Sequence, residues 1–187
     1  RFRNELKTAR KIGHPNVART YDLNESEGTH YITMDYVRGE NLKSLIRKIG
    51  RMSPAQTIAI ARQVCDGLAE AHKLGVIHRD LKPQNIMVDE NGRAMIVDFG
   101  IARSIHSESL TDTGIMIGTP EYMAPEQTEG DNPGPHGDVY ALGVILYEML
   151  TGEPPFSGQT PVAIAMNHKT KPPPNPSAKN PPIPESL

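Results

Sequence analysis

The sequence His-Arg-Asp-Leu-Lys-Pro-Gln-Asn occupies residues 78–85 and decides how the rest of the chain is interpreted. Asp-Phe-Gly follows at residues 98–100, and Ala-Pro-Glu follows at residues 124–126. Each motif by itself is common, and alone it would be read as an exposed turn or the end of a strand. All three in this order, within 187 residues, are not explained by chance.

The three motifs match H-R-D-x-x-x-x-N, D-F-G and A-P-E, so the chain resembles a protein kinase catalytic domain. It is most similar to the bacterial eukaryotic-like Ser/Thr kinases. The resemblance implies an α+β fold with a mostly helical C-terminal lobe and a partial N-terminal lobe. Residues 1–37 would be the remnant of the N-lobe and the hinge, and residues 38–187 the C-lobe without its final helices. The implied activity is ATP-dependent phosphorylation of protein Ser/Thr hydroxyls.

Phosphoryl transfer needs metal ions on the phosphates, a positioned hydroxyl and charge stabilisation. Asp98 and Asn85 offer the oxygen ligands that suit Mg²⁺ (or Mn²⁺), and the resemblance assigns both to the metal. Asp80 would accept the proton of the substrate hydroxyl, and Lys82 would place a positive charge near the moving phosphate. Thr119 would hydrogen-bond Asp80 and Lys82. Lys82 and Thr119 are both marks of the Ser/Thr branch.

The resemblance also implies a site for the adenine of ATP. Met34 would be the gatekeeper behind the base, and the backbone of Asp35 and Val37 would hydrogen-bond its edge. Met87 and Val97 would pack on its face. Their plainer interpretation is strand core, which is compatible with that role.

Four residues would support the site rather than react. They are His78, Arg79, Glu126 and Asp138. Asp138 matches a buried aspartate that fixes the backbone of the catalytic loop. The chain departs from the family here, because His136-Gly137 stands where Arg-Ser is usual.

The segment between Gly100 and Gly118 is polar and predicts a surface loop. Thr111 and Thr113 lie at the distance from Thr119 where bacterial members carry paired phosphothreonines. The resemblance implies that Arg79 grips the phosphorylated loop. The alternative is a flexible loop whose Ser and Thr residues are unmodified.

Two parts of the family pattern are missing from residues 1–187. No two glycines are two positions apart, so there is no G-x-G-x-x-G, and no Val-Ala-Ile-Lys strand precedes Glu5. Glu5 matches the helix glutamate that pairs with that strand's lysine and so supports ATP binding. We therefore expect a domain truncated at both ends that is weakly active or inactive alone. The alternative is a non-catalytic pseudokinase or scaffold module.

Hydrophobic periodicity predicts several elements. Helices are expected over residues 1–12, 42–49, 54–75 and 138–150, and strands over 17–23, 29–36, 86–88 and 94–97. The helix from residue 54 should bury Ile58, Ala61, Cys65, Leu68 and His72, which makes Cys65 a buried structural thiol. The proline-rich tail from Lys171 is either a linker or a connection between two late helices.

Composition limits the partners of the chain. The net charge is −2, with 20 basic and 22 acidic residues, so no overall field favours nucleic acid. One cysteine excludes an intrachain disulfide framework. No apolar run is long enough to span a bilayer, so we expect a cytoplasmic domain whose parent protein can be anchored elsewhere. The expected partners are protein substrates that carry Ser or Thr. A dimer of kinase domains in the parent protein is a further possible partner interaction.

Overall fold

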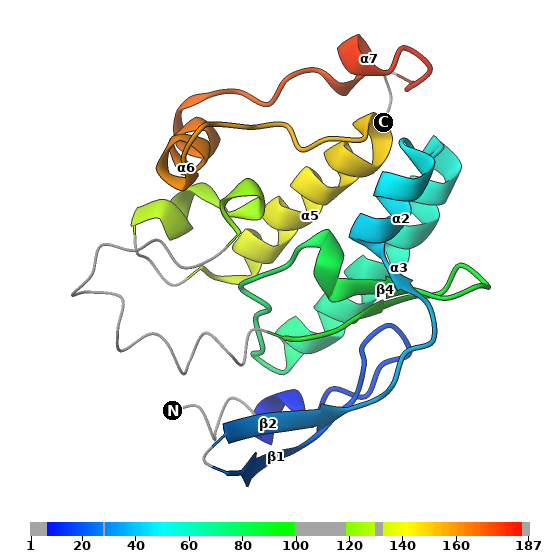
Figure 1. Cartoon of the computed structure of the whole chain (residues 1–187), viewed down its shortest axis with the longest axis vertical. Coiled ribbons are helices and arrows are strands. Elements are labelled where there is room, and N and C mark those ends of the chain that lie inside the picture. The colour runs from blue at the N-terminus through cyan, green and yellow to red at the C-terminus, as the bar shows by residue number, and fades with distance from the viewer. Residues whose placement is uncertain (1–6, 28, 100–118, 130–132, 185–187) are drawn as a thin grey trace.

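The computed structural model describes residues 7–27, 29–99, 119–129 and 133–184. Within these ranges the chain has two small antiparallel sheets at one side of a group of helices (Figure 1). The strands are β1 (Thr20–Ser26), β2 (Thr29–Met34), β3 (Glu40–Asn41), β4 (Ile86–Val88) and β5 (Ala94–Ile96). The α-helices are α2 (Leu42–Ile49), α3 (Pro54–Lys73), α5 (Pro135–Thr151), α6 (Pro161–Thr170) and α7 (Pro176–Lys179). The 3₁₀ helices are η1 (Pro83–Asn85), η2 (Pro120–Tyr122) and η3 (Pro125–Glu129).

Strands β1 and β2 form a hairpin that lies at one end of the molecule (Figure 1). The second sheet has the order β3-β4-β5 and follows the predicted strands 86–88 and 94–97 closely. The two sheets are joined by the segment before β1, where the Ala18 N–H donates to the Ile96 carbonyl at 2.9 Å. The β1–β2 hairpin is therefore attached directly to the sheet whose strand β4 follows residues 78–85.

Helices α2 and α3 begin and end where the sequence predicts. The Asn41 side chain accepts from the Ser44 N–H at 2.9 Å, and Gly50 ends α2 at φ 80°. Ser53 and Gln56 form a capping box at the start of α3. These ends are fixed by local hydrogen bonds, which is why they are legible in the sequence.

The predicted buried face of α3 is wrong by part of a turn. The helix buries Thr57, Ile60, Val64, Gly67, Leu68 and Ala71, so of the expected residues only Leu68 is fully buried. Cys65 is exposed rather than a buried structural thiol. Gly67 sets the rotation, because a Cβ there would lie 3.0 Å from the Asn16 carbonyl oxygen and 3.1 Å from Ile96 Cδ1. Close approach to the segment before β1 and to β5 turns this face inward.

Helix α5 is the centre of the core and begins three residues before the predicted Asp138. It buries residues on most of its circumference, including Leu142, Ile145 and Met149. These side chains join one cluster with Leu42, Ile46, Val64, Ile86 and Ile96. Gly152 ends the helix at φ 87°, as predicted.

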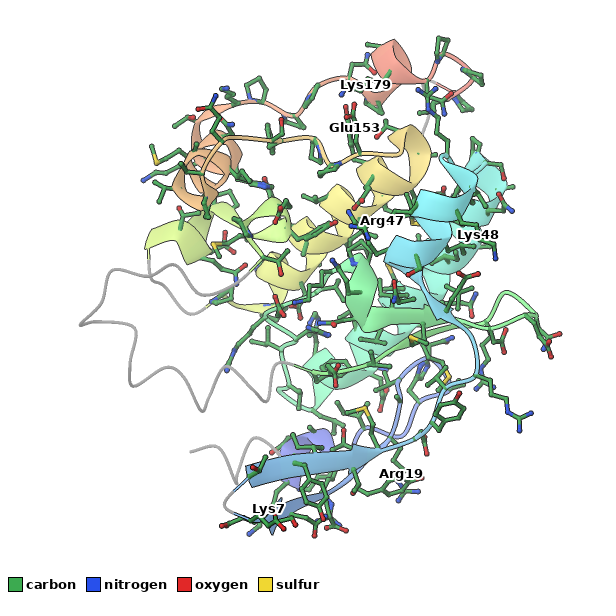
Figure 2. The ribbon with its side chains drawn as sticks, in the orientation of Figure 1. Lys7, Arg19, Arg47, Lys48, Glu153 and Lys179 are labelled. Atoms are coloured by element: carbon green, nitrogen blue, oxygen red, sulfur yellow. The ribbon has the colours of Figure 1, made fainter. Side chains whose placement is uncertain are left out.

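Helix α6 ends just before the proline-rich tail, and the short helix α7 begins at Pro176 within it, with Pro172–Pro174 between the two helices. Ile183 is buried, and the Asn180 side chain donates to the Leu150 carbonyl at 2.8 Å. Figure 2 shows Lys179 of α7 beside Glu153 beyond α5, and the two form an ion pair. None of the helices in the described ranges is long and apolar enough to cross a membrane.

Candidate active site

Residues 78–85 form the candidate catalytic segment, which we call the catalytic segment, and they bring together a carboxylate, an amine and the hydroxyl of Thr119. The Lys82 ammonium donates to Asp80 Oδ2 at 2.7 Å and to the Thr119 hydroxyl at 3.1 Å. Thr119 lies 37 positions along the chain, immediately before η2. All three side chains are partly exposed, so a ligand can reach them. Asp80 Oδ1 has no hydrogen-bond partner among the described residues and is available to one from solution.

Asn85 and Asp98 are brought together by the β4–β5 hairpin. Asn85 precedes β4, and its carbonyl accepts from the Val97 N–H at 2.9 Å, so Asp98 is the next residue along. The Asn85 amide donates to the Asp80 carbonyl at 3.0 Å, which leaves its Oδ1 as the ligand atom. Asp98 is exposed at φ 56°, in the left-handed region that aspartate and asparagine adopt more readily than other non-glycine residues. One amide oxygen and one carboxylate fit Mg²⁺, which takes few protein ligands and completes its octahedron with phosphate and water.

Asp138 in the first turn of α5 binds the backbone of the catalytic segment. Its carboxylate is 1% exposed and accepts from the backbone N–H groups of His78 (2.8 Å) and Arg79 (2.9 Å). His72 of α3 makes a third contact, at 2.7 Å from Nε2. These bonds support the left-handed backbone of Arg79, which has φ 64°.

The family departure at Gly137 has a steric reason. A Cβ on Gly137 would lie 2.6 Å from Pro133 Cβ, far inside van der Waals contact. The glycine therefore lets Pro133 pack against the first turn of α5. The contacts of Asp138 are complete without the usual arginine.

His78 connects the catalytic segment to residues 97–99. The side chain is fully buried, Nδ1 accepts from the Asp80 N–H at 3.3 Å, and Nε2 donates to the Val97 carbonyl at 3.2 Å. Its ring lies 4.9 Å from that of Phe99. Burial holds the pKa of the imidazole below its ordinary value of 6.5, although Asp138 pulls the pKa the other way. His78 is therefore neutral, because both ring nitrogens are used in the neutral tautomer.

The lowered pKa of His78 predicts that the fold is less stable at acidic pH. A histidine pKa that is lower in the folded state means that the unfolded chain binds more protons near and below pH 6.5. The contribution of His78 to stability is thus complete above pH 6.5 and falls as the pH is lowered. We expect the urea midpoint to fall between pH 7.5 and pH 5.5. In ¹³C NMR, the His78 ring signals should titrate at a lower pH than those of a histidine in an unfolded peptide. If they titrate as in an unfolded peptide while the urea midpoint stays constant, His78 is not a buried neutral group.

The segment after Thr119 is anchored by a buried polar cluster that sequence reasoning missed. Glu148 of α5 is 1% exposed, forms an ion pair with Lys43 of α2, and accepts from the Tyr122 hydroxyl at 2.5 Å. Lys43 also donates to the Tyr122 oxygen at 3.1 Å. Burial and the Glu148 hydrogen bond raise the pKa of Tyr122. A glutamate inside a predicted core helix is the one signal that pointed to such a partner.

A second link joins the Ala-Pro-Glu region to the catalytic segment. Gln127 donates to the Arg79 carbonyl at 3.0 Å and accepts from the Ala124 N–H at 2.9 Å. Neighbouring Glu126 is partly buried, and it has no ion pair within the described part of the chain. Gln127, rather than Glu126, makes the contact to the catalytic segment.

The adenine candidates lie along the connection between the two sheets. Met34 ends β2, and Asp35 and Val37 follow it; all three are partly buried. The connection continues into β3, which pairs with β4 so that Asn41 is opposite Met87. Met87 is partly buried between the buried Ile86 and Val88, and Val97 is partly buried between the buried Ile96 and the exposed Asp98. Glu5, Thr111 and Thr113 lie outside the described residues.

Comparisons with known proteins found one matching family and several relatives of this chain. The family described as protein kinase domain matches residues 1–183. Serine/threonine-protein kinase PrkC of Bacillus subtilis is 39% identical over 187 residues, covering 100% of this chain and 29% of PrkC. Serine/threonine-protein kinase PknB of Mycobacterium leprae is 43% identical over 185 residues, covering 96% of this chain and 30% of PknB. The chain thus spans about 30% of the length of these relatives.

A solved structure is similar in fold. Rad53 residues 1–466, in complex with AMP-PNP, superposes with a TM-score of 0.71 at 29% sequence identity. The match covers 88% of this chain and 41% of the Rad53 chain.

Proposed function

Because this chain belongs to the protein kinase family, we propose that it carries the catalytic segment of an enzyme that transfers the γ-phosphate of ATP to protein Ser/Thr hydroxyls. The observation that carries the proposal is the joint contact of Lys82 with Asp80 and Thr119. A scaffold has no need to hold these three side chains together at a partly exposed surface. Asn85 and Asp98 would add two oxygen ligands for a metal ion.

In this proposal Asp80 orients the attacking hydroxyl. Its Oδ1, which has no partner among the described residues, accepts the hydroxyl hydrogen bond and then the proton, while Oδ2 remains bonded to Lys82. Lys82 keeps the carboxylate in one orientation and offers its positive charge to the transferred phosphoryl group. Thr119 accepts a hydrogen bond from the same lysine. The position of Lys82 therefore depends on residues 119–122, which Tyr122 anchors to Glu148.

Asn85 and Asp98 would hold Mg²⁺ or Mn²⁺ against the phosphates of ATP, where the metal neutralises their charge. Met34, Asp35, Val37, Met87 and Val97 would line the adenine. The AMP-PNP in the Rad53 structure supports a nucleotide site in this fold.

The proposal is tested with the full-length protein, γ-labelled ATP, Mg²⁺ and a generic protein substrate. We expect labelled phosphoserine and phosphothreonine after acid hydrolysis, and no phosphotyrosine. Nucleotide binding without transfer in the full-length protein would instead identify a pseudokinase.

Residues 1–187 alone should transfer phosphate slowly. They contain neither a G-x-G-x-x-G loop nor a lysine strand before Glu5, and both supply charge stabilisation to the phosphates. Loss of one such preorganised group typically costs about 10²–10³ in rate. We expect the isolated 187 residues to be at least that much slower than the full-length protein in the same assay. Equal turnover numbers would show that these elements are dispensable.

A further inference from the structure

A second concave surface lies where the chain enters β1 and leaves β2. It encloses about 380 Å³, and we call it the basic pocket. Figure 2 shows one of its residues, Arg19, beside the end of β2 that leads to the second sheet. Its lining excludes Asp80, Lys82, Asn85 and Asp98. Its ionisable lining residues are Arg10, Lys11, His14, Arg19, Asp35 and Arg93.

The pocket is positively charged, although the chain as a whole carries a small negative charge. Four lining side chains are permanent cations and one is a carboxylate, whereas the whole chain has a net charge of −2. The carboxylate of Asp35 is already engaged, since it accepts from the Tyr21 hydroxyl at 2.5 Å and the Arg19 N–H at 3.0 Å. These two hydrogen bonds, with a smaller contribution from the Arg19 guanidinium itself, lower the pKa of Asp35 and keep it ionised.

The cations of the pocket are not consumed by strong ion pairs. Arg10 pairs with Asp22 at 2.9 Å, but both side chains are about half exposed, and such pairs contribute little and exchange readily. Arg93 uses one N–H on the Pro15 carbonyl at 2.9 Å, which leaves most of its donors for a ligand. Lys11 has no side-chain ion pair in the described ranges.

The floor of the pocket is preformed. Ile12 and Val17, which line it, are 2% and 4% exposed. Between them the Asn16 side chain donates to the Ala94 carbonyl at 2.7 Å, and the Asn16 carbonyl accepts from the Ile96 N–H at 2.8 Å. A rigid floor below several cations lowers the ordering cost of binding an anion.

We propose that the basic pocket binds the phosphate of a phosphorylated serine or threonine on a protein segment. Guanidinium groups match phosphate oxygens in bidentate geometry, and a phosphomonoester brings about −1.5 to −2 charge, against −1 for a carboxylate. None of the described lining residues is Phe, Tyr or Trp, and the nearby Tyr21 ring already lies against the Arg19 guanidinium, so the pocket favours a small side chain over a stacked nucleotide base. The choice of serine and threonine rests on the proposed function, whose products are these phosphorylated residues.

The test is calorimetry on the full-length protein with saturating AMP-PNP and Mg²⁺, so that the candidate nucleotide site is filled. The probes are acetyl-Gly-Ala-phosphoThr-Ala-Gly-amide, the same peptide with threonine, and inorganic phosphate. We expect the phosphopeptide to bind at least tenfold more tightly than either of the others. Equal affinity for inorganic phosphate would overturn the assignment to a protein-borne group.

Substitutions in the pocket test whether the phosphopeptide binds there. Arg93→Gln should weaken phosphopeptide affinity about tenfold, and Lys11→Gln, an exposed change that leaves the packing intact, should weaken it severalfold. The matched control is Arg62→Gln on the exposed face of α3, which should bind like the unaltered protein. Unchanged affinity in both pocket variants, or equal binding of the two peptides, would sink the proposal. Phosphate transfer is measured separately, so failure of the kinase assay and failure of this site are distinguishable.

Discussion

Asp80→Asn should reduce kcat of the full-length protein by about 10²–10⁴, the usual contribution of a positioned general base. An amide has almost the shape of the carboxylate but cannot accept the hydroxyl proton. It also weakens the hold on Lys82, whose ammonium now donates to Asp80 Oδ2 at 2.7 Å. The KM for ATP should change little, because Asp80 is assigned to the hydroxyl and not to the nucleotide.

Two comparisons sharpen this result. Asp66→Asn, the same change at an exposed position of α3, should leave kcat unaltered. Asp98→Asn should instead weaken Mg²⁺-dependent nucleotide binding in calorimetry, because Asp98 is assigned to the metal. Weakened nucleotide binding in Asp80→Asn with intact binding in Asp98→Asn would mean that the two roles are exchanged.

Asp138→Ala should lower the free energy of unfolding by about 2–6 kcal/mol. It leaves the buried N–H groups of His78 and Arg79 without their acceptor, at about 1–3 kcal/mol each. A loss of this size is a large part of the 5–15 kcal/mol that stabilises a typical domain. The contact with His72 is lost as well.

Urea denaturation of the full-length protein measures the loss, and hydrogen exchange locates it. Faster exchange at the His78 and Arg79 amides is expected, and Asp66→Ala serves as the exposed control. Asp138→Asn should be intermediate, since its single carbonyl oxygen cannot replace both carboxylate oxygens. A change within about 0.5 kcal/mol for Asp138→Ala would show that these hydrogen bonds do not support the segment.

Local features of the fold were predictable from the sequence. The ends of α2 and α3 depend on Asn41, Gly50 and the Ser53–Gln56 capping box, which are contacts within a few residues. The β4–β5 hairpin was likewise predicted, and it brings Asn85 beside the residues before Asp98. The motif spacing was sufficient to indicate the family, because it is a property of the chain itself.

The buried face of α3 could not be predicted in the same way. Its apolar residues allow more than one inward face, and the periodicity favoured the one with Ile58 and Cys65. The actual rotation follows from Gly67, whose missing side chain admits the Asn16 carbonyl and Ile96. That contact exists only when three separate parts of the chain have come together.

The sequence by itself determined the family, the local elements and the chemical types of the candidate catalytic groups. Only the tertiary structure decided which residues distant in sequence come into contact. Examples are Lys43 with Glu148 and Tyr122, and the cations that line the basic pocket. The physical reason is that helix caps and hairpin turns are satisfied by neighbours in sequence. A buried charge must find its partner wherever packing places one, here 105 residues away for Lys43 and Glu148.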